Sequence, residues 1–516
     1  MSAPGEKPAD PNVEKARDEE AVHRPVAAPT GKPWMYKKLK IGPLTLPYYA
    51  SPTSQLLLVS FVCFLCPGMY NALNGLGGGG QQDAHAVNQG NTALYSTFAV
   101  IGFFAGSIAN RIGLRYTLFF GGFGYFLYVG SMLSYNHNRN LGFLTFAGAL
   151  LGACAGCLWC AQGAVMMSYP DEKSKGRYIS WFWVIFNLGG VIGSLVPLFQ
   201  TMNSPEGKAV GDATYIAFMV LMFLGFLLCF GLVESKYVRR PDGSQVIVMK
   251  NPSWSSEIKG LWEVLKSDYY IVLLFPMFIA SNWFYTYHFN NVNSARFNIR
   301  TRSLNTCLYY LAQMAGAFSF GYLLDMNFMR RTMRARVGLG LLFALTMGIW
   351  GGGYVWQRQY TREMTEAEGA PRIDWKDNEY VGGMFLYIFY GFYDAAYQTC
   401  VYWFMGALTN NGRKLANFAG FYKGLQSAGG AVTWQIDDKK VSFMATFAIN
   451  WALLCGSIVI ALPVILWKIK DTVDIEEDLK FSDETLEEVA PTALLEDRGL
   501  TATGNDTAGA QTLSKN

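Results

Sequence analysis

Charged residues are scarce in this chain. Asp, Glu, Lys and Arg make up 16% of its 516 residues, whereas hydrophobic residues make up 51%. A single soluble core rarely grows to this size, so the composition favours a protein that crosses a lipid bilayer several times. The basic residues are also scattered along the chain, which argues against a nucleic-acid partner.

Signatures of enzymes and of bound cofactors are also missing. The sequence contains no GxSxG, HExxH or P-loop pattern, and its four histidines do not cluster. A GxGxxG match at residues 75–80 follows an apolar segment instead of a strand, so it does not predict a nucleotide site. Cys154, Cys157 and Cys160 lack a fourth metal ligand. We therefore expect no catalysis, no cofactor and no bound metal.

Long apolar segments, in contrast, recur along the whole chain. Twelve of them, each about 18 to 27 residues long, can cross the hydrocarbon of a membrane. They lie at 53–75, 91–110, 116–134, 141–167, 178–200, 213–233, 268–289, 304–325, 336–355, 381–407, 415–435 and 443–467. We therefore predict an all-α, multi-pass membrane protein. The third, sixth, ninth and twelfth segments contain the fewest polar residues, and we expect them to face lipid.

The two halves of the chain resemble each other. Residues 106–115 close the second segment with glycines and basic residues, and a similar stretch from Gly321 closes the eighth. A separation of six segments is the register of two parallel six-helix bundles. We predict bundles at 51–233 and 268–470, a cytosolic linker at 234–267, and disordered cytosolic tails at 1–50 and, acidic in character, at 471–516.

The distribution of Lys and Arg predicts the orientation. If both tails are cytosolic, the connections on the cytosolic side contain the larger share of the basic residues, as the positive-inside rule requires. No targeting signal is legible, so the plasma membrane and internal membranes are both open as the location.

Ionisable side chains inside two apolar segments mark a candidate cavity. Lys423 shares its helix face with Gln426, and Asp394 lies near the middle of its segment beside Gln398. A lysine near the bilayer centre costs about 2.5–3.5 kcal/mol on insertion scales, so such a residue needs a wet cavity or a partner. We hypothesise that Lys423 and Asp394 pair directly across a cavity. The alternative is that the lysine stem reaches towards the membrane interface.

Other polar and aromatic residues complete the candidate site. Asn71 and Asn74 lie within one turn, and they either present amides to a solute or form hydrogen bonds between helices. His288 is expected near the outer end of its helix, where an interfacial role competes with proton relay. The candidate substrate-binding residues are Asn71, Asn74, Trp159, Gln162, Asn187, Asn282, Tyr285, Asp394, Gln398, Lys423 and Gln426.

Glycines at four-residue spacing predict close contacts between helices. Gly148, Gly152 and Gly156 have this spacing in the fourth segment, and Gly420 and Gly424 have it in the eleventh. Without a Cβ atom at these positions, the backbones of two helices can approach closely.

Three stretches, "YNALNGLGG" at 70–78, "LWCAQG" at 158–163 and "YKGLQSAGGAVTWQID" at 422–437, resemble the major facilitator superfamily. They are most similar to its uncoordinated (Unc-ninety-three)-like branch, especially to fungal members, and the likeness covers about residues 50–470. It implies twelve helices in two bundles around a central cavity. It also implies gating loops, to which we assign Gly106, Asn110, Arg111, Gly113, Arg115, Gly321 and Asp325.

Two departures from the family pattern matter. Asn110 stands where the signature loop of the superfamily has an acid, although Asp325 keeps the acid in the second half. Trp159 stands where many proton-coupled relatives have an arginine, so ordinary proton antiport is disfavoured.

These features predict a transporter that moves a small polar or ionic solute through a central cavity by alternating access, with the lipid bilayer as its other partner. The resemblance also implies an alternative, a non-transporting regulator or trafficking partner of an ion channel or receptor. A polar, wet centre would favour transport, and a packed, dry centre would favour regulation.

Overall fold

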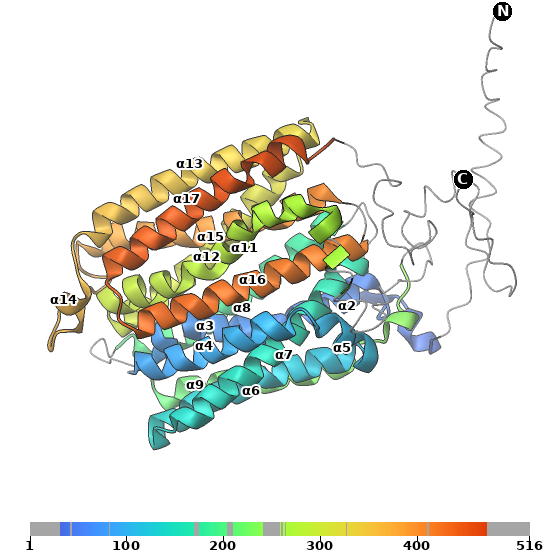
Figure 1. The fold of residues 1–516 in the computed structure, drawn as a ribbon. Coiled ribbons are helices and arrows are strands. Elements are labelled where there is room, and N and C mark those ends of the chain that lie inside the picture. The colour runs from blue at the N-terminus through green and yellow to red at the C-terminus, as the bar shows by residue number, and fades with distance from the viewer. Residues whose placement is uncertain are drawn as a thin grey trace, which may run out of the picture.

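The computed structural model describes residues 31–41, 44–81, 83–169, 175–203, 210–240, 259, 262–263, 265–326, 328–409 and 412–471. Almost all regular structure in these residues is helical. The helices run roughly side by side, and their connections gather at two opposite ends of the molecule (Figure 1).

The first half of the chain forms the N-terminal bundle. In chain order it contains α2 (Pro52–Cys63), the π-helix η2 (Phe64–Gly68), α3 (Met69–Gly75), the short η3 (Gly78–Gly80), α4 (Ala84–Ile101), α5 (Ala105–Ile112), α6 (Leu114–Asn138), α7 (Leu141–Ser168), α8 (Lys175–Thr201), α9 (Asp212–Leu227) and η4 (Leu228–Gly231). The first crossing unit therefore runs through α2, η2 and α3. Pro67 within η2 has no backbone N–H to donate, which accounts for the interruption of the α-helix between α2 and α3.

The second half forms the C-terminal bundle. After the short η5 (Ser235–Tyr237), it contains η6 (Tyr269–Leu274), α11 (Phe275–Trp283), the π-helix η7 (Tyr287–Ser294), α12 (Ile299–Leu324), α13 (Arg331–Gln357), the short α14 (Arg362–Glu366), α15 (Tyr380–Leu408), α16 (Gly412–Asp438) and α17 (Phe443–Trp467). The seventh crossing unit thus changes its winding twice, through η6, α11 and η7.

The predicted fold of twelve crossing helices in two bundles is confirmed. Eight of the described crossing units are long and apolar enough to span a membrane by length and composition. The other four contain α4, α11, α15 and α16. Two of these units are interrupted, and α15 and α16 are rich in polar and tyrosine side chains. Such side chains are tolerated within a membrane where they face the protein interior.

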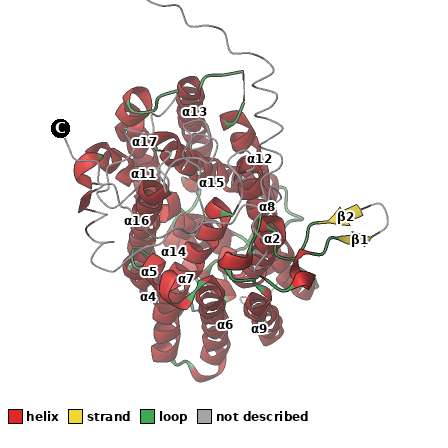
Figure 2. Ribbon diagram, turned by 90° about the vertical axis from the view of Figure 1, so that its right-hand side faces the viewer, coloured by secondary structure: helices red, strands yellow, loops and turns green. Residues whose placement is uncertain are grey.

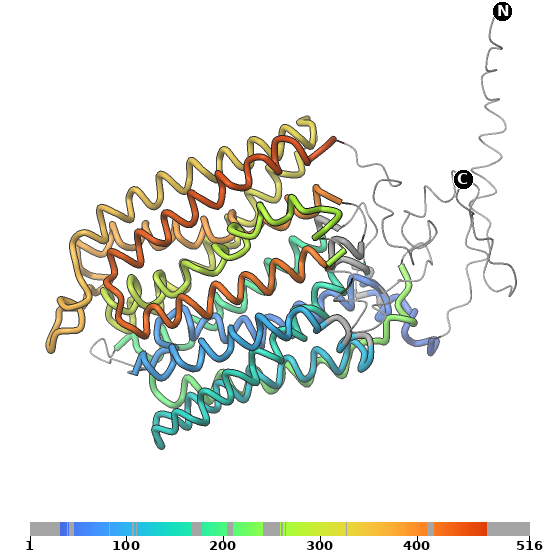
Figure 3. Tube along the Cα trace, viewed as in Figure 1, coloured from blue at the N-terminus to red at the C-terminus, as the bar shows by residue number. Residues whose placement is uncertain are grey.

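The four helices predicted to face lipid lie at two edges of the molecule. In Figure 1 and in the tube of Figure 3, α6 and α9 form one edge of the molecule, and α13 and α17 form the opposite edge. Large apolar side chains on these helices are exposed, among them Phe223 on α9 and Val459 on α17. Helices α4 and α16 lie side by side where the two bundles meet.

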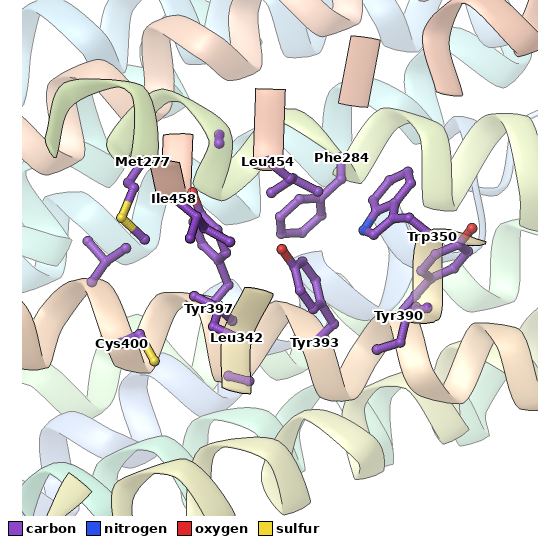
Figure 4. Close-up of a cluster of buried hydrophobic side chains, with 14 of the residues drawn as sticks. Met277, Phe284, Leu342, Trp350, Tyr390, Tyr393, Tyr397, Cys400, Leu454 and Ile458 are labelled. Carbon is purple, nitrogen blue, oxygen red and sulfur yellow. The ribbon is translucent and has the colours of Figure 1, made fainter. Parts of the chain in front are cut away.

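Each bundle has its own core of buried apolar side chains. The core of the C-terminal bundle is rich in aromatic rings, and Figure 4 shows Phe284, Trp350, Tyr390 and Tyr393 within it. The Tyr393 hydroxyl lies 2.7 Å from Thr346 Oγ1, as expected for a buried phenol that needs a polar partner.

One part of the predicted N-terminal tail is ordered, so that prediction is corrected. Residues 33–46 contain η1 (Pro33–Tyr36) and an antiparallel pair, β1 (Leu39–Ile41) and β2 (Leu44–Leu46), which projects from the bundle in Figure 2. The Tyr36 hydroxyl donates to Tyr237 O at 2.8 Å, and the Tyr48 hydroxyl donates to Arg239 O at 2.7 Å. These tyrosines fix the segment to the chain that follows α9. Residues 1–30, 241–258 and 472–516, which contain most of the predicted tails and linker, lie outside the described residues.

The glycines of α7 bring this helix close to α4, as predicted. A Cβ atom at Gly148 would overlap Gly90 O, and one at Gly152 would overlap Leu94 O and Thr97 Oγ1. Backbone atoms cannot move aside as a flexible side chain can, so these two positions require glycine.

The prediction holds only in part for α16. A Cβ atom at Gly424 would overlap the ring of Phe103 in the opposite bundle, whereas one at Gly420 would meet open space. Gly156 on α7 is less tightly packed than Gly148 and Gly152, because a Cβ atom there would lie 3.2 Å from Gly102 N.

Replacing Gly152 by alanine is therefore expected to destabilise the protein by about 1–3 kcal/mol, since α7 must move away from α4. Thermal unfolding of the purified protein measures this effect. Gly420→Ala, where the added methyl group meets no atom, should leave the melting temperature almost unchanged. Equal shifts for the two variants would contradict the assignment.

Candidate functional site

The helix connections gather at two opposite ends of the molecule, which we call the α14 end and the terminal end. The α14 end contains α14 and the connections that follow α3, α6, η7 and α16 (Figure 1). The terminal end is the opposite one, where the described chain enters α2 and leaves α17. With the predicted cytosolic tails, the α14 end would face away from the cytosol.

Asp394 lies at the middle of α15 and is fully buried. Four side chains donate hydrogen bonds to its carboxylate. Gln398 donates to Oδ1 at 2.7 Å and Tyr285 to the same atom at 3.4 Å, while Tyr309 donates to Oδ2 at 3.0 Å and Gln313 also binds Oδ2. A buried carboxylate without a cation needs such donors to replace its hydration.

Lys423 lies on α16 with its ammonium between the two bundles. Its Nζ lies 5.4 Å from the ring centroid of Trp159 on α7, 5.5 Å from that of Tyr402 and 5.1 Å from that of Tyr422. It donates a hydrogen bond to Gln426 Oε1 at 2.9 Å. The side chain therefore faces the interior and not the membrane interface. Cation–π contacts of this kind stabilise a partly desolvated ammonium.

Two amides connect Lys423 with Asp394. Gln426 Nε2 donates to Gln398 Oε1 at 3.3 Å, and Gln398 Nε2 donates to the carboxylate. Among the described residues, no ion pair joins the ammonium to the carboxylate. The hypothesis of a direct pair is therefore corrected, because the two glutamines occupy the space between the charges. We call Lys423, Gln426, Gln398 and Asp394 the polar chain.

The structure separates the other predicted site residues. Asn74 is buried in the N-terminal bundle and accepts from Asn91 Nδ2 at 3.2 Å, which is the interhelical alternative. Asn71 is half-buried, and its backbone carbonyl accepts from the Tyr310 hydroxyl at 2.9 Å. Gln162 is buried, and its Nε2 lies 3.4 Å from the sulfur of Met166.

Among the described contacts, Asn187 and Asn282 form no hydrogen bond with the polar chain. Asn187 is buried, and its Oδ1 has no partner among the described residues. Asn282 is half-buried on α11. Of the predicted residues, Trp159, Tyr285, Asp394, Gln398, Lys423 and Gln426 thus come together.

His288 is not at an interface, which corrects that prediction. Its side chain is fully buried within the aromatic core of the C-terminal bundle, and its Nδ1 lies 3.2 Å from the Tyr309 hydroxyl. The seventh segment was predicted to end at residue 289, but η7 continues the helix to Ser294, so His288 lies inside the crossing unit and not at its end.

A second polar cluster joins the bundles at the α14 end. Asp437 on α16 is buried, and its Oδ1 accepts from Arg362 at 2.7 Å. Its Oδ2 accepts from Asn88 of the N-terminal bundle at 3.0 Å and from Asn290 at 2.8 Å. Asn290 also donates to Asn88 Oδ1 at 3.2 Å. We call Asn88, Asn290, Arg362 and Asp437 the clamp.

Backbone contacts extend the clamp. Arg302 on α12 is buried and donates to Leu76 O at 2.6 Å and to Gly77 O at 2.7 Å. Asn293 donates to Gly75 O at 2.9 Å. Gly77 has φ +78°, and a side chain there would overlap Phe289 O, so the glycines at 75–80 serve a tight turn between the bundles.

The loop between α14 and α15 is fixed near the clamp by Asp374. Although partial burial opposes ionisation, hydrogen bonds from Arg300 and Asn298 lower the pKa of Asp374 to about 2. Arg300 binds both carboxylate oxygens, at 2.7 and 2.9 Å, and also donates to Met202 O of the N-terminal bundle at 2.9 Å. The carboxylate therefore remains ionised at physiological pH and keeps this second link between the bundles.

The predicted gating loops lie at the terminal end. Gly113 has φ +82° between α5 and α6, and Arg115 Nε donates to Leu232 O at 2.8 Å. In the second half, Arg331 donates to Gly406 O and Arg334 donates to Leu324 O, both at 2.9 Å. The basic residues thus bind the carbonyl ends of neighbouring helices in both halves, where the helix dipole favours a cation.

Among the other predicted gating residues, Arg111 and Asp325 are exposed and Gly321 lies within α12. Gly106 and Asn110 lie within α5.

Comparisons with known proteins agree with this geometry. Residues 46–433 match the Major Facilitator Superfamily. The UNC93-like protein C922.05c of Schizosaccharomyces pombe is 50% identical over 470 residues, which are 91% of this chain and 93% of that protein. UNC93-like protein 1 of Arabidopsis thaliana is 44% identical over 428 residues, which are 83% of this chain and 92% of that protein.

Solved structures show the same fold at low sequence identity. The xylose transporter XylE from E. coli, in a partially occluded inward open conformation, gives a TM-score of 0.57 at 12% identity and covers 81% of this chain and 98% of its own. The E. coli fucose:proton symporter FucP gives a TM-score of 0.53 at 13% identity, with 80% and 98% covered. The chain is therefore an integral, multi-pass membrane protein that belongs to the major facilitator superfamily and, within it, to the UNC93-like branch.

Proposed function

We propose that this protein is a transporter that moves a small polar or ionic solute by alternating access of its two bundles. The observation that supports this best is the polar chain. It runs near the middle of α15 and α16, from the ammonium of Lys423 where the bundles meet, through two amides, to the carboxylate of Asp394 inside the C-terminal bundle. Groups of this kind are expensive within a membrane, and they usually serve a solute or an ion.

The surroundings of Lys423 suit a solute with an anionic or carbonyl group. Lys423 is half-buried. Among the described contacts, one of its three N–H donors is used, by Gln426. The rings of Trp159 and Tyr402, one from each bundle, offer flat surfaces on which a solute can pack. We assign solute binding to Lys423, Gln426, Trp159 and Tyr402.

The contacts between the bundles fit a conformation that is closed at the α14 end. The clamp and Arg302 join the bundles by hydrogen bonds and an ion pair at the α14 end. In the terminal half, the described contacts between the bundles include ring contacts of Phe103 with Phe421 and of Trp183 with Tyr402. Alternating access then requires the clamp to open while the ring contacts tighten.

The test uses purified protein and a panel of anionic, zwitterionic and neutral polar solutes. Thermal stabilisation identifies a bound solute, and uptake into proteoliposomes tests its transport. Lys423→Gln should weaken binding by about 10- to 100-fold, since a hydrogen bond to a charged group contributes about 1.5–3 kcal/mol. Lys376→Gln, at an exposed lysine in the loop before α15, is the matched control and should have no effect.

A different outcome would favour the alternative function. If no solute on the panel stabilises the protein or enters the vesicles, and Lys423→Gln behaves as the wild type does, transport is contradicted. The role of a regulator or trafficking partner of an ion channel or receptor would then be the better proposal.

A further inference from the structure

A basic segment precedes α2 and belongs neither to the polar chain nor to the clamp. Residues 31–41 and 44–50 include η1, β1 and β2, and we call them the hairpin segment. Its exposed side chains include Lys32, Lys37, Lys38 and Lys40, and the sequence from 31 to 50 contains no acidic residue. Among the described residues, no ion pair neutralises any of these lysines. The hairpin segment is therefore a concentrated patch of positive charge.

The hairpin segment lies beside the crossing helices and at the terminal end. Figure 2 views the molecule from this end, and β1 and β2 lie there outside the outline of the helices. In Figure 1 the same stretch of chain, at the blue end of the colour bar, lies at the terminal end next to α2. Headgroups of the surrounding lipids form a layer at the ends of the crossing helices. A segment that projects sideways at this level faces that layer.

Hydrogen bonds hold the hairpin segment in this place. In addition to the tyrosine contacts described for the fold, the Tyr49 hydroxyl binds Gly231 O, and Arg239 N donates to Ala50 O at 3.1 Å. Gly231 and Arg239 belong to the chain that follows α9 and leads towards the second bundle. The hairpin segment is therefore joined both to the first crossing helix and to the start of the connection between the bundles.

Trp34 adds an aromatic ring of the kind that is enriched at membrane interfaces. Its side chain is 51% exposed, and its ring centroid lies 5.2 Å from that of Tyr49. Tryptophan favours the level of the headgroups, where one part of its ring system meets apolar chains and the other meets water. In the strands, Lys40 pairs with Thr45, and the other paired residues are apolar. Lysines combined with an exposed tryptophan and apolar residues are typical of segments that lie in the interface.

We propose that the hairpin segment binds the headgroups of anionic phospholipids in the leaflet at the terminal end. A cluster of lysines close to a crossing helix attracts such lipids by charge. With the predicted cytosolic tails, this is the cytosolic leaflet, whose surface is negative because it contains anionic lipids. Lipid binding then holds the first crossing helix and the start of the connection between the bundles at one membrane surface. The inference is independent of the proposed transport.

Hydrogen exchange of the full chain in lipid nanodiscs tests the proposal. Backbone amides of the hairpin segment should exchange at least about 10-fold more slowly in discs that contain phosphatidylserine than in discs of phosphatidylcholine alone. Each lysine near an anionic surface strengthens binding by about five-fold. Lys38→Gln combined with Lys40→Gln should therefore weaken the binding by about 25-fold and remove the slowing.

Lys376→Gln combined with Lys439→Gln is the matched control. It removes the same amount of charge from two exposed lysines at the α14 end, so the slowing in the hairpin segment should persist. An equal loss in both double variants, or the same exchange rate of the wild type in both kinds of disc, would overturn the proposal. Inorganic phosphate added to phosphatidylcholine discs should not slow the exchange. Slowing by phosphate alone would identify a site for free phosphate and would also contradict binding to a lipid surface.

Salt provides a second measurement, which needs only the wild-type chain and so does not depend on the folding of a variant. At about 1 M salt the Debye length falls to about 3 Å, so the attraction between the lysines and the headgroups is screened. The slowing by phosphatidylserine should then disappear, and its persistence would contradict binding by charge. Because no solute is involved, a failure of lipid binding leaves the proposed transport intact, and a failure of solute uptake leaves the lipid site intact.

Discussion

Arg362→Ala is expected to open the α14 end, with a loss of about 3–5 kcal/mol from the closed state. Arg362 and Asp437 are both about nine-tenths buried or more, and the guanidinium lies 2.7 Å from the carboxylate. Removal of one partner leaves the other as an uncompensated buried charge, and this is where most of the cost arises. Spin labels at Ala84 on α4 and Lys439 beside α16, which are both exposed, measure the separation of the bundles at this end.

Two further variants separate the role of the buried charge from that of a missing side chain. Arg358→Ala removes an exposed arginine four residues before α14 and should leave the label distance unchanged. Combining Arg362→Ala with Asp437→Asn removes the orphaned charge and should restore much of the closed population. If the double variant is as open as Arg362→Ala, the closure does not depend on this ion pair.

The clamp illustrates what the sequence could not predict. The sequence places Asp437 on the same helix face as Lys423, and it shows the cluster of asparagines at 290–293. Neither pattern reveals that Asp437 contacts Arg362 of α14 and Asn88 of the other bundle. Such a site forms from long-range contacts, and helical periodicity reports only on neighbours within one helix.

Helix positions and helix faces, in contrast, could be predicted well. Apolar length located the crossing units, and the spacing of Asp394 with Gln398 and of Lys423 with Gln426 assigned the inward faces correctly. The prediction of a direct pair between Lys423 and Asp394 was wrong. The relative heights of the two residues along their helices do not reveal that the Gln398 and Gln426 side chains lie between them.

The prediction for His288 was wrong for a different reason. The apolar segment was predicted to end at residue 289, but η7 continues the helix to Ser294. His288 therefore lies inside the crossing unit, and its ring contacts Tyr309 and Tyr390 in the core. A search for apolar runs stops where polar residues such as Asn290 begin, even when those residues are helical and buried.

Asp394→Ala is expected to lower the free energy of unfolding by at least about 3 kcal/mol, because it removes the acceptor of four donors. Those of Tyr309 and Gln313 are buried, where each unsatisfied group costs about 1–3 kcal/mol, and those of Tyr285 and Gln398 are half-buried. Asp394→Asn keeps one acceptor oxygen, and we expect it to lose less. Thermal unfolding of purified protein measures both, with Asp325→Ala, at an exposed acid on the end of α12, expected within about 0.5 kcal/mol of wild type. The order of the three variants is the decisive result. If the Asp394 carboxylate had no structural role, its replacement by alanine would cost little stability. The carboxylate instead joins three helical segments, because it accepts hydrogen bonds from Tyr285, Tyr309, Gln313 and Gln398. No other described group can accept all four of these hydrogen bonds at once, so the alanine variant should lose stability.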